Sequence, residues 1–229
     1  HESIVDAIQF AKEKKLLIIA VYLQQIQRTL SKLVGRDEEF DYSQEGRDIL
    51  ASNSSVSRSD YYQLAYVSFI FRLYDDTVEM IEKYFTFQDT TWVTILFIAH
   101  SVHAFHIGLI SFWVARKSGE QKWYERGHQC KIALRRWVDS SEWTFGNKLY
   151  LLEAEESFCK KDFETAKAFY TKAVTSAKDH KFVHEEALAH ELAAYFHLEL
   201  GEKEETIEHF RLAHEKYLEW GALGKCDSL

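Results

Sequence analysis

The 229-residue sequence contains no proline. Average usage would place about eleven prolines in a chain of this length, and a proline interrupts a helix interior. Only nine glycines and three cysteines are present. So few glycines leave little room for glycine-rich loops, and three widely spaced cysteines predict neither a disulfide framework nor a zinc ribbon. These absences favour long helices in a reducing, cytoplasmic compartment.

An excess of basic side chains is also missing. The chain has 28 Lys and Arg against 36 Asp and Glu, a formal charge of −8. It therefore lacks the electrostatic footprint of a protein that binds nucleic acid. Phosphate-binding glycine loops, the Gly-x-Ser-x-Gly elbow and the kinase His-Arg-Asp and Asp-Phe-Gly motifs do not occur. We expect a non-catalytic chain with no cofactor, no metal and no nucleic-acid partner.

Helical periodicity, by contrast, runs along most of the sequence. Apolar residues at three- and four-residue steps predict one long helix over 3–34 that ends at Gly35. The polar segment 36–59 is expected to be a solvated loop with a short helix near 47–51, and a site of regulatory phosphorylation is the alternative. No stretch alternates strongly enough to predict a strand.

Four helical pairs are predicted over the rest of the chain. A natural N-cap at Asp162 and breaks at Gly119 and Gly201 support the boundaries. The pairs are 60–73 with 75–87, 90–117 with 120–141, 146–160 with 162–180, and 183–200 with 203–219.

The last two pairs repeat with a shift of 40 residues, and the repeat indicates the fold class. Small residues where helices cross, with an aromatic residue that fills the gap, resemble the tetratricopeptide pattern, whose usual period is about 34 residues. We predict an all-α, tetratricopeptide-like solenoid of antiparallel helix pairs in a right-handed superhelix. One helical-repeat domain over 1–229 would contain the first helix and loop (1–59), two longer pairs (60–142) and two tetratricopeptide-like pairs (143–229). The matched positions are Ala154 with Ala194, Ala166 with Thr206, Tyr170 with Phe210, and Ala173 with Ala213.

A histidine-rich stretch, HEEALAHELAAYFH over 184–197, raises the question of chemistry. His184 and His190 lie about 240° apart around a helix, so they cannot bind one ion. His190-Glu191-Leu192 superficially resembles a phospho-acceptor box, but the Arg-Thr-Pro that normally follows is missing. We predict an ordinary repeat helix. The residues expected to pack inward are Ala189, Leu192, Ala193 and Phe196.

Residues 90–115 contain no Asp, Glu, Lys or Arg. Twenty-six uncharged residues are long enough to cross a bilayer. Their histidines, serines and threonines are unfavourable in lipid, and a helix that is apolar all round also suits the centre of a solenoid. We expect a buried helix, with a membrane span as the alternative. We interpret His100, His103 and His106 as packed imidazoles rather than metal ligands.

Several motifs of residues 143–229 together resemble a known family. They match a helical region of very large signalling proteins, in which a serine/threonine kinase-like domain and a predicted AAA-type ATPase come first. A GAF domain and a histidine kinase or another output domain often follow. The resemblance implies that this chain is a fragment from the end of the helical array, with the kinase and ATP-binding residues outside it. The motifs are Phe145-x-Asn147, Ala154-Glu155, Phe182-Val183, EALAHELA over 186–193, and Tyr217-Leu218-x-Trp220-Gly221-Ala222-x-x-Lys225.

From these observations we expect a protein-interaction and scaffolding solenoid within a multidomain ATPase-kinase signalling protein. It would bind a protein or peptide partner, or neighbouring domains of its own polypeptide, on a concave groove. The alternatives are an intramolecular regulatory arm that couples an ATPase module to a kinase output domain, and a membrane-associated domain through 90–115. Tetratricopeptide-like geometry places six residues near the groove: Leu151, Glu155, Phe158, Glu191, Tyr195 and Leu198.

Overall fold

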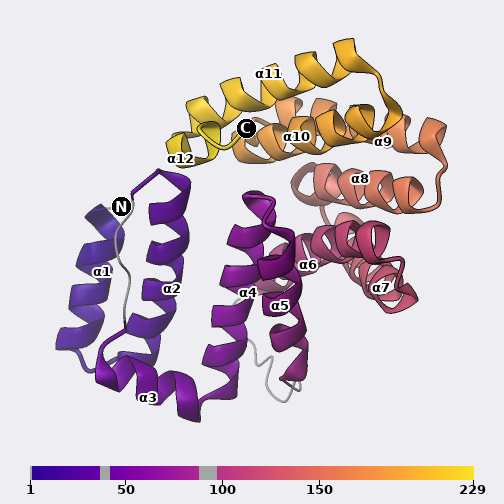
Figure 1. Cartoon of the computed structure of the whole chain (residues 1–229). Coiled ribbons are helices and arrows are strands. Elements are labelled where there is room, and N and C mark those ends of the chain that lie inside the picture. The colour runs from indigo at the N-terminus through magenta and orange to yellow at the C-terminus, as the bar shows by residue number, and fades with distance from the viewer. Residues whose placement is uncertain (1, 37–41, 88–96) are drawn as a thin grey trace. The chain divides into compact units, whose positions relative to one another are not determined.

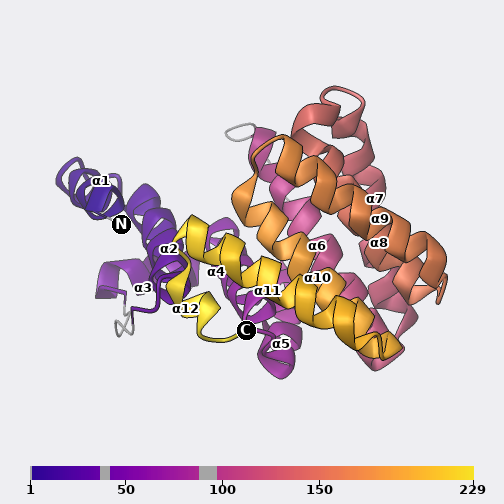
Figure 2. The same ribbon diagram turned by 90° about the horizontal axis from the view of Figure 1, so that it is seen from above.

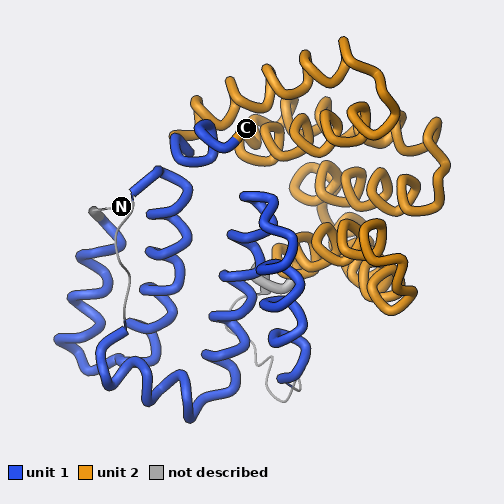
Figure 3. Tube along the Cα trace, in the orientation of Figure 1, with its two compact units in different colours: residues 1–93, 222–228 blue, residues 94–221, 229 orange. Residues whose placement is uncertain are grey.

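A computed structural model describes residues 2–36, 42–87 and 97–229, and every regular element in these segments is a helix (Figure 1). Packing contacts divide the chain into two compact units, coloured separately in Figure 3. Unit 1 comprises residues 1–93 with 222–228, and unit 2 comprises residues 94–221 with 229. Each unit is described by itself, and the single domain expected from the sequence stays a prediction.

Unit 1 contains two helix pairs and two shorter helices. In the first pair α1 packs against α2, and in the second α4 packs against α5. Helix α2 also contacts α3, α4 and the C-terminal helix α12. The bounds are Glu2–Glu13 for α1, Leu17–Leu33 for α2, Gln44–Ser52 for α3, Ser54–Ile70 for α4, Tyr74–Thr86 for α5 and Leu223–Cys226 for α12.

The single helix predicted over 3–34 is wrong, because the chain reverses at Lys15. This residue has a left-handed φ of 58°, and the following amide, of Leu16, donates to the carbonyl of Ala11 over 2.8 Å. The reversal lets α1 pack against α2, with Ala11 and Ala20 buried. Neither glycine nor proline marks this turn, and the helical spacing of apolar residues continues across it. The sequence pattern therefore gives no sign of the reversal.

The short helix expected near 47–51 is present as α3, but the predicted loop 36–59 is more helical than expected, because α4 already begins at Ser54. Ser43 caps α3 by accepting a hydrogen bond from the amide of Gly46 over 3.2 Å. Asn53 caps α4 by accepting one from the amide of Val56 over 3.1 Å. Serine and asparagine favour these N-cap positions, so the polar residues that indicated a loop in fact start two helices. Residues 37–41 of the segment lie outside the described residues.

Unit 2 contains three helix pairs: α6 with α7, α8 with α9, and α10 with α11. Each pair packs on the next, since α8 contacts both α6 and α7, and α10 contacts both α8 and α9 (Figure 2). The first seven residues of the predicted helix 90–117 lie outside the described residues. The bounds are Phe97–Ser118 for α6, Gln121–Val138 for α7, Glu142–Cys159 for α8, Phe163–Asp179 for α9, Val183–Leu200 for α10 and Lys203–Trp220 for α11.

One type of turn joins α8 to α9, α9 to α10 and α10 to α11 in unit 2. A residue with left-handed φ ends the helix: Lys161 and Lys181 at 61°, and Gly201 at 77°. In the α8–α9 turn the amide of Asp162 donates back to the carbonyl of Ser157 over 3.0 Å. This is the Schellman pattern, which satisfies the last carbonyls of a helix. Lysine occupies the left-handed position at two of these turns although glycine would adopt it without strain.

The core of unit 2 has small residues where helices cross and one aromatic cluster between them. Phe196 of α10 lies 5.1 Å from Phe158 of α8 and 5.2 Å from Tyr170 of α9, measured between ring centroids. Ala154 and Ala194, which match in the sequence repeat, are both fully buried. The prediction of an all-α fold of antiparallel helix pairs is therefore confirmed, whereas the right-handed superhelix stays a prediction.

The uncharged segment 90–115 corresponds in part to α6. Within the described residues, no helix has both the length and the apolar character that a bilayer span requires. Ile110 and Phe112 of α6 are fully buried in unit 2. Residues 90–96 lie outside the described part of the chain.

Candidate functional site

Most of the six residues predicted to line a groove lie inside the fold. Leu151, Phe158, Glu155 and Glu191 are buried, and the two glutamates are each only 1% exposed. Tyr195 is half-buried, and Leu198 is 54% exposed. Burial corrects the expectation for the first four, because no partner can contact them in this fold. Only Tyr195 and Leu198 remain accessible.

Internal partners explain why the two glutamates are buried. Glu155 of α8 accepts a hydrogen bond from the hydroxyl of Tyr170 over 2.5 Å and forms an ion pair with Arg116 of α6. Glu191 of α10 accepts one from the hydroxyl of Tyr217 on α11 over 2.7 Å. A buried carboxylate requires such partners. These glutamates hold neighbouring helices together and are not part of a binding surface.

The histidine-rich stretch 184–197 also faces inward in part. His190 is 6% exposed, and its Nδ1 lies 2.9 Å from Nδ1 of His209 on α11. Burial, with His209 nearby, lowers the pKa of His190 to about 4. His184 lies elsewhere and stacks on Trp220 at 5.3 Å between ring centroids. The described side chains contain no group of three or more His, Cys, Asp or Glu residues suited to hold a metal ion.

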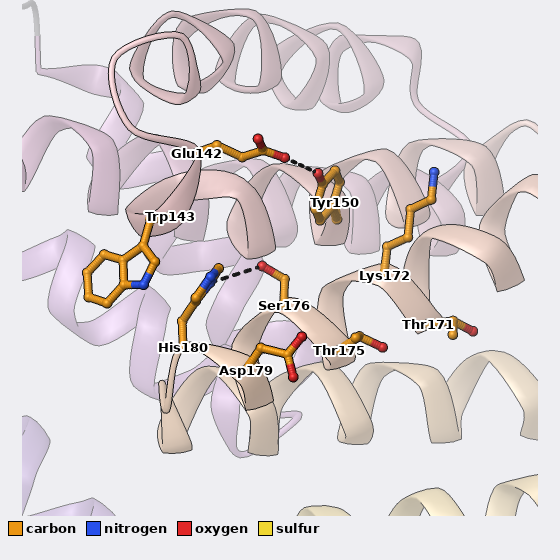
Figure 4. A pocket seen from close by; sticks show the side chains of 9 residues that line it. All are labelled: Glu142, Trp143, Tyr150, Thr171, Lys172, Thr175, Ser176, Asp179 and His180. Atoms are coloured by element: carbon orange, nitrogen blue, oxygen red, sulfur yellow. Dashed lines mark hydrogen bonds between the residues drawn. The ribbon is translucent and has the colours of Figure 1, made fainter.

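A surface hollow between α8 and α9 is the best candidate site (Figure 4). Its volume is about 660 Å³, and it is open to solvent. The first three turns of α8 contribute Glu142, Trp143 and Tyr150. The C-terminal half of α9 and its C-cap residue contribute Thr171, Lys172, Thr175, Ser176, Asp179 and His180.

Helix geometry brings these residues together. Because α8 and α9 are antiparallel, the first turns of α8 lie beside the last turns of α9. On α8, Trp143 and Tyr150 are seven residues apart, two turns on one face. On α9, Thr171, Thr175 and Asp179 recur every four residues and also share a face. Two local patterns that are distant in sequence therefore form one site.

Side-chain contacts hold two aromatic residues of the hollow, Tyr150 and Trp143, in place. Tyr150 donates its hydroxyl hydrogen to Oε1 of Glu142 over 2.7 Å, and this hydrogen bond raises the pKa of Tyr150. Trp143 packs against the rings of His180 and Phe182, at 5.4 and 5.2 Å between centroids. The indole nevertheless remains exposed, at 57% for the residue. An exposed tryptophan held by its neighbours is a typical anchor for a ligand.

The polar groups of the hollow suit binding better than catalysis. The hydroxyl oxygen of Ser176 lies 3.5 Å from Nδ1 of His180, at the outer limit of a hydrogen bond. A nucleophile and its base normally lie about 2.6–3.2 Å apart. By contrast, hydroxyls, carboxylates and an ammonium group around an aromatic floor offer donors and acceptors to a polar chain.

No family model, no similar curated protein and no similar solved structure matches the chain. The resemblance to the helical region of kinase-ATPase signalling proteins therefore stays a prediction. Its motifs do have clear structural positions here. Gly221 adopts a left-handed φ of 85° at the end of α11, and Ala222 and Lys225 are buried in unit 1. In the EALAHELA motif over 186–193, Ala189 and Ala193 are buried in α10.

Sequence reasoning did not find the hollow. It assigned binding to the middle and C-terminal end of α8 and α10, where four of the six side chains are in fact buried. One signal was available: Trp143 lies in the first turn of a helix, two residues after the N-cap residue Ser141. A tryptophan in a first turn has few neighbours to bury it, and this one is exposed.

Proposed function

We propose that this chain is a protein-interaction and scaffolding module that acts without catalysis. Its helical pairs form a rigid support, and the hollow between α8 and α9 binds a peptide of a partner protein. The observation that carries the proposal is the exposed indole of Trp143, fixed by two aromatic neighbours at the edge of a polar hollow. Binding sites on rigid elements with a preorganised aromatic anchor lose little entropy when a ligand binds.

The test is a peptide selection on the complete 229-residue chain. A random peptide library is displayed and selected for binding, and the Trp143→Ala variant removes peptides that bind elsewhere. We expect peptides that bind the parent chain at least about tenfold more tightly than the variant, as for an aromatic hot spot. If no peptide depends on Trp143, the hollow is not the binding site.

We further propose, from the sequence resemblance alone, that the chain belongs to a large cytoplasmic signalling protein with kinase and ATPase modules. An immunoblot with an antibody against residues 143–229 tests this placement. A native polypeptide far larger than the 26.9 kDa of this chain is expected. A native band near 27 kDa would leave a free-standing adaptor instead.

The intramolecular arm that couples an ATPase to a kinase output is the alternative within the same placement. It predicts a different outcome of the selection, because helices that only transmit a conformational change need no peptide ligand. A large native polypeptide together with no Trp143-dependent peptide would therefore favour the arm.

A further inference from the structure

We infer that the hollow between α8 and α9 binds an extended peptide segment with one basic and one acidic side chain three residues apart. The inference rests on the proposed function and specifies its ligand. The hollow has opposite charges at its two ends, as Figure 4 shows: Trp143 and Asp179 lie toward one end and Lys172 toward the other. A complementary ligand must carry both charges in the reverse arrangement.

The acidic end is suited to a guanidinium or ammonium group. This end has two carboxylates. One of them, Glu142, already accepts a hydrogen bond from the hydroxyl of Tyr150. Asp179 is exposed and has no hydrogen-bond or ion-pair partner within 42–87 or 97–229. The exposed face of Trp143 lies at the same end. A cationic side chain can stack on the indole and pair with the free carboxylate, two interactions that arginine combines well.

The basic end is suited to a carboxylate. The ammonium of Lys172 lies 5.0 Å from the ring centroid of Phe169. That ring in turn stacks on Tyr150 at 6.4 Å between centroids. The ammonium group thus lies over an aromatic ring, and the lysine remains exposed to solvent. An acidic side chain of the ligand would meet this ammonium group.

The distance between the ends sets the spacing in the ligand. Lys172 and Asp179 are seven residues apart on α9, which places them on one face about 10 Å apart along the axis. In a polyproline II segment, residues three apart point the same way and lie about 9 Å apart. The two spacings agree closely. Between the charged ends, the hydroxyls of Thr175 and Ser176 are placed to bind the carbonyl and amide groups of the ligand backbone.

The test measures binding of defined peptides to the complete chain by fluorescence anisotropy. The peptides are fluorescein-labelled Ala-Pro-Arg-Pro-Pro-Glu-Pro-Ala, the same peptide with Arg and Glu exchanged, and a form with Gln at both positions. One of the two charged orders is expected to bind roughly tenfold more tightly than the Gln form.

Two variants locate the charge recognition. Lys172→Glu should weaken the better peptide by about fivefold, the upper range for an exposed ion pair. The Lys172→Glu variant should also bind a modified peptide, in which Arg replaces Glu, more tightly than the parent chain binds that peptide. Lys178→Glu makes the same charge change on α9 outside the lining of the hollow, and it should leave the affinity unchanged.

The outcomes separate this inference from the proposed function. Equal binding of all three peptides, or no difference between the Lys172 and Lys178 variants, overturns the charge pattern. If selected peptides of other sequence still depend on Trp143, the proposed function stands without it. If no peptide in either experiment depends on Trp143 for binding, both the inference and the proposed function are overturned.

Discussion

The hydroxyl of Tyr150 donates a hydrogen bond of 2.7 Å to Oε1 of Glu142, two turns earlier on the same face of α8. The bond fixes the phenol ring at the edge of the hollow and places the carboxylate beside Trp143. It also raises the pKa of Tyr150, because ionising the phenol would remove the donor and place a second negative charge next to Glu142.

Glu142→Gln should therefore lower the pKa of Tyr150 toward its ordinary value near 10. An alkaline titration of the chain labelled with ¹³C at the tyrosine Cζ positions would measure the change by NMR. Tyr124 serves as an internal control, since its hydroxyl donates to Glu156 and its own pKa should not move. An unchanged pKa for Tyr150 would show that the hydrogen bond does not form in solution.

Replacing either of two tryptophans of unit 2 by alanine should change the free energy of unfolding by very different amounts. Trp143→Ala removes an exposed side chain, so the free energy of unfolding should change by less than about 1 kcal/mol. Trp123→Ala removes a side chain with 0% exposure and should cost about 3–5 kcal/mol. Urea denaturation followed by circular dichroism measures both. A large loss with Trp143→Ala would mean that Trp143 supports the fold and is not simply available for a ligand.

His190 should contribute to a fall in the stability of the chain between about pH 6.5 and pH 4. Its pKa is lowered from 6.5 to about 4 by burial and by His209. Within this range the unfolded chain binds a proton at this position and the folded chain does not, so stability decreases as the pH falls. The expected loss is about 3 kcal/mol. Lys178 of α9 and Glu208, His209 and Lys216 of α11 are the charged or titratable groups that act on His190.

His190→Gln should remove the share of this pH dependence that His190 contributes, because glutamine stays neutral and can still hydrogen-bond to His209. The pKa of His106 is lowered to about 3 by burial, and that of His209 is also lowered, so these two residues contribute the remainder. His214→Gln, on the exposed side of α11, is the matched control and should retain the parental slope. Urea unfolding at several pH values gives the comparison. Carboxylates such as Glu156, with a pKa of about 2, respond only below about pH 4.5 and do not obscure the range. If the free energy of unfolding changed equally with pH in the two variants, His190 would not contribute to the pH dependence.

Gly224→Ala should release α12 from α2 within unit 1. A Cβ at this position would lie 2.5 Å from the carbonyl oxygen of Lys32 and 2.6 Å from Cα of Gly35, both of which are backbone atoms that cannot give way locally. Hydrogen exchange should show lost protection of the amides of Lys225 and Cys226. Leu223→Ala, at a half-exposed position of the same helix, should retain it. Unchanged protection in the glycine variant would show that α12 does not pack this closely.

The sequence predicted helix pairs well wherever a residue marked the turn. Breaks were expected at Gly119 and Gly201, and both residues adopt the left-handed conformation between helices. The turn at Lys15 was missed because lysine adopts the same conformation without a local signal. Helix α12 was missed because it is short and depends on the close approach of Gly224 to Gly35, a contact between distant parts of the sequence.

The candidate site was harder to predict than the fold. Glu155 and Glu191 looked like surface residues because charged side chains usually are, but Tyr170 and Tyr217 bind them in the interior. Such pairing depends on the packing of helices and leaves no periodic pattern. The hollow likewise needs Trp143 and Asp179, which are far apart in sequence and meet only because α8 and α9 are antiparallel.

The most direct test of the binding site is NMR mapping with a peptide obtained by selection on the parent chain. The chain is labelled with ¹⁵N, and its indole and backbone amide signals are followed as peptide is added. The indole signal of Trp143 and the amide signals of Thr175 and Asp179 should shift together and saturate with one dissociation constant. Shifts confined to Tyr195 and Leu198, with Trp143 unchanged, would contradict the hollow as the site and return binding to the groove first expected from the sequence.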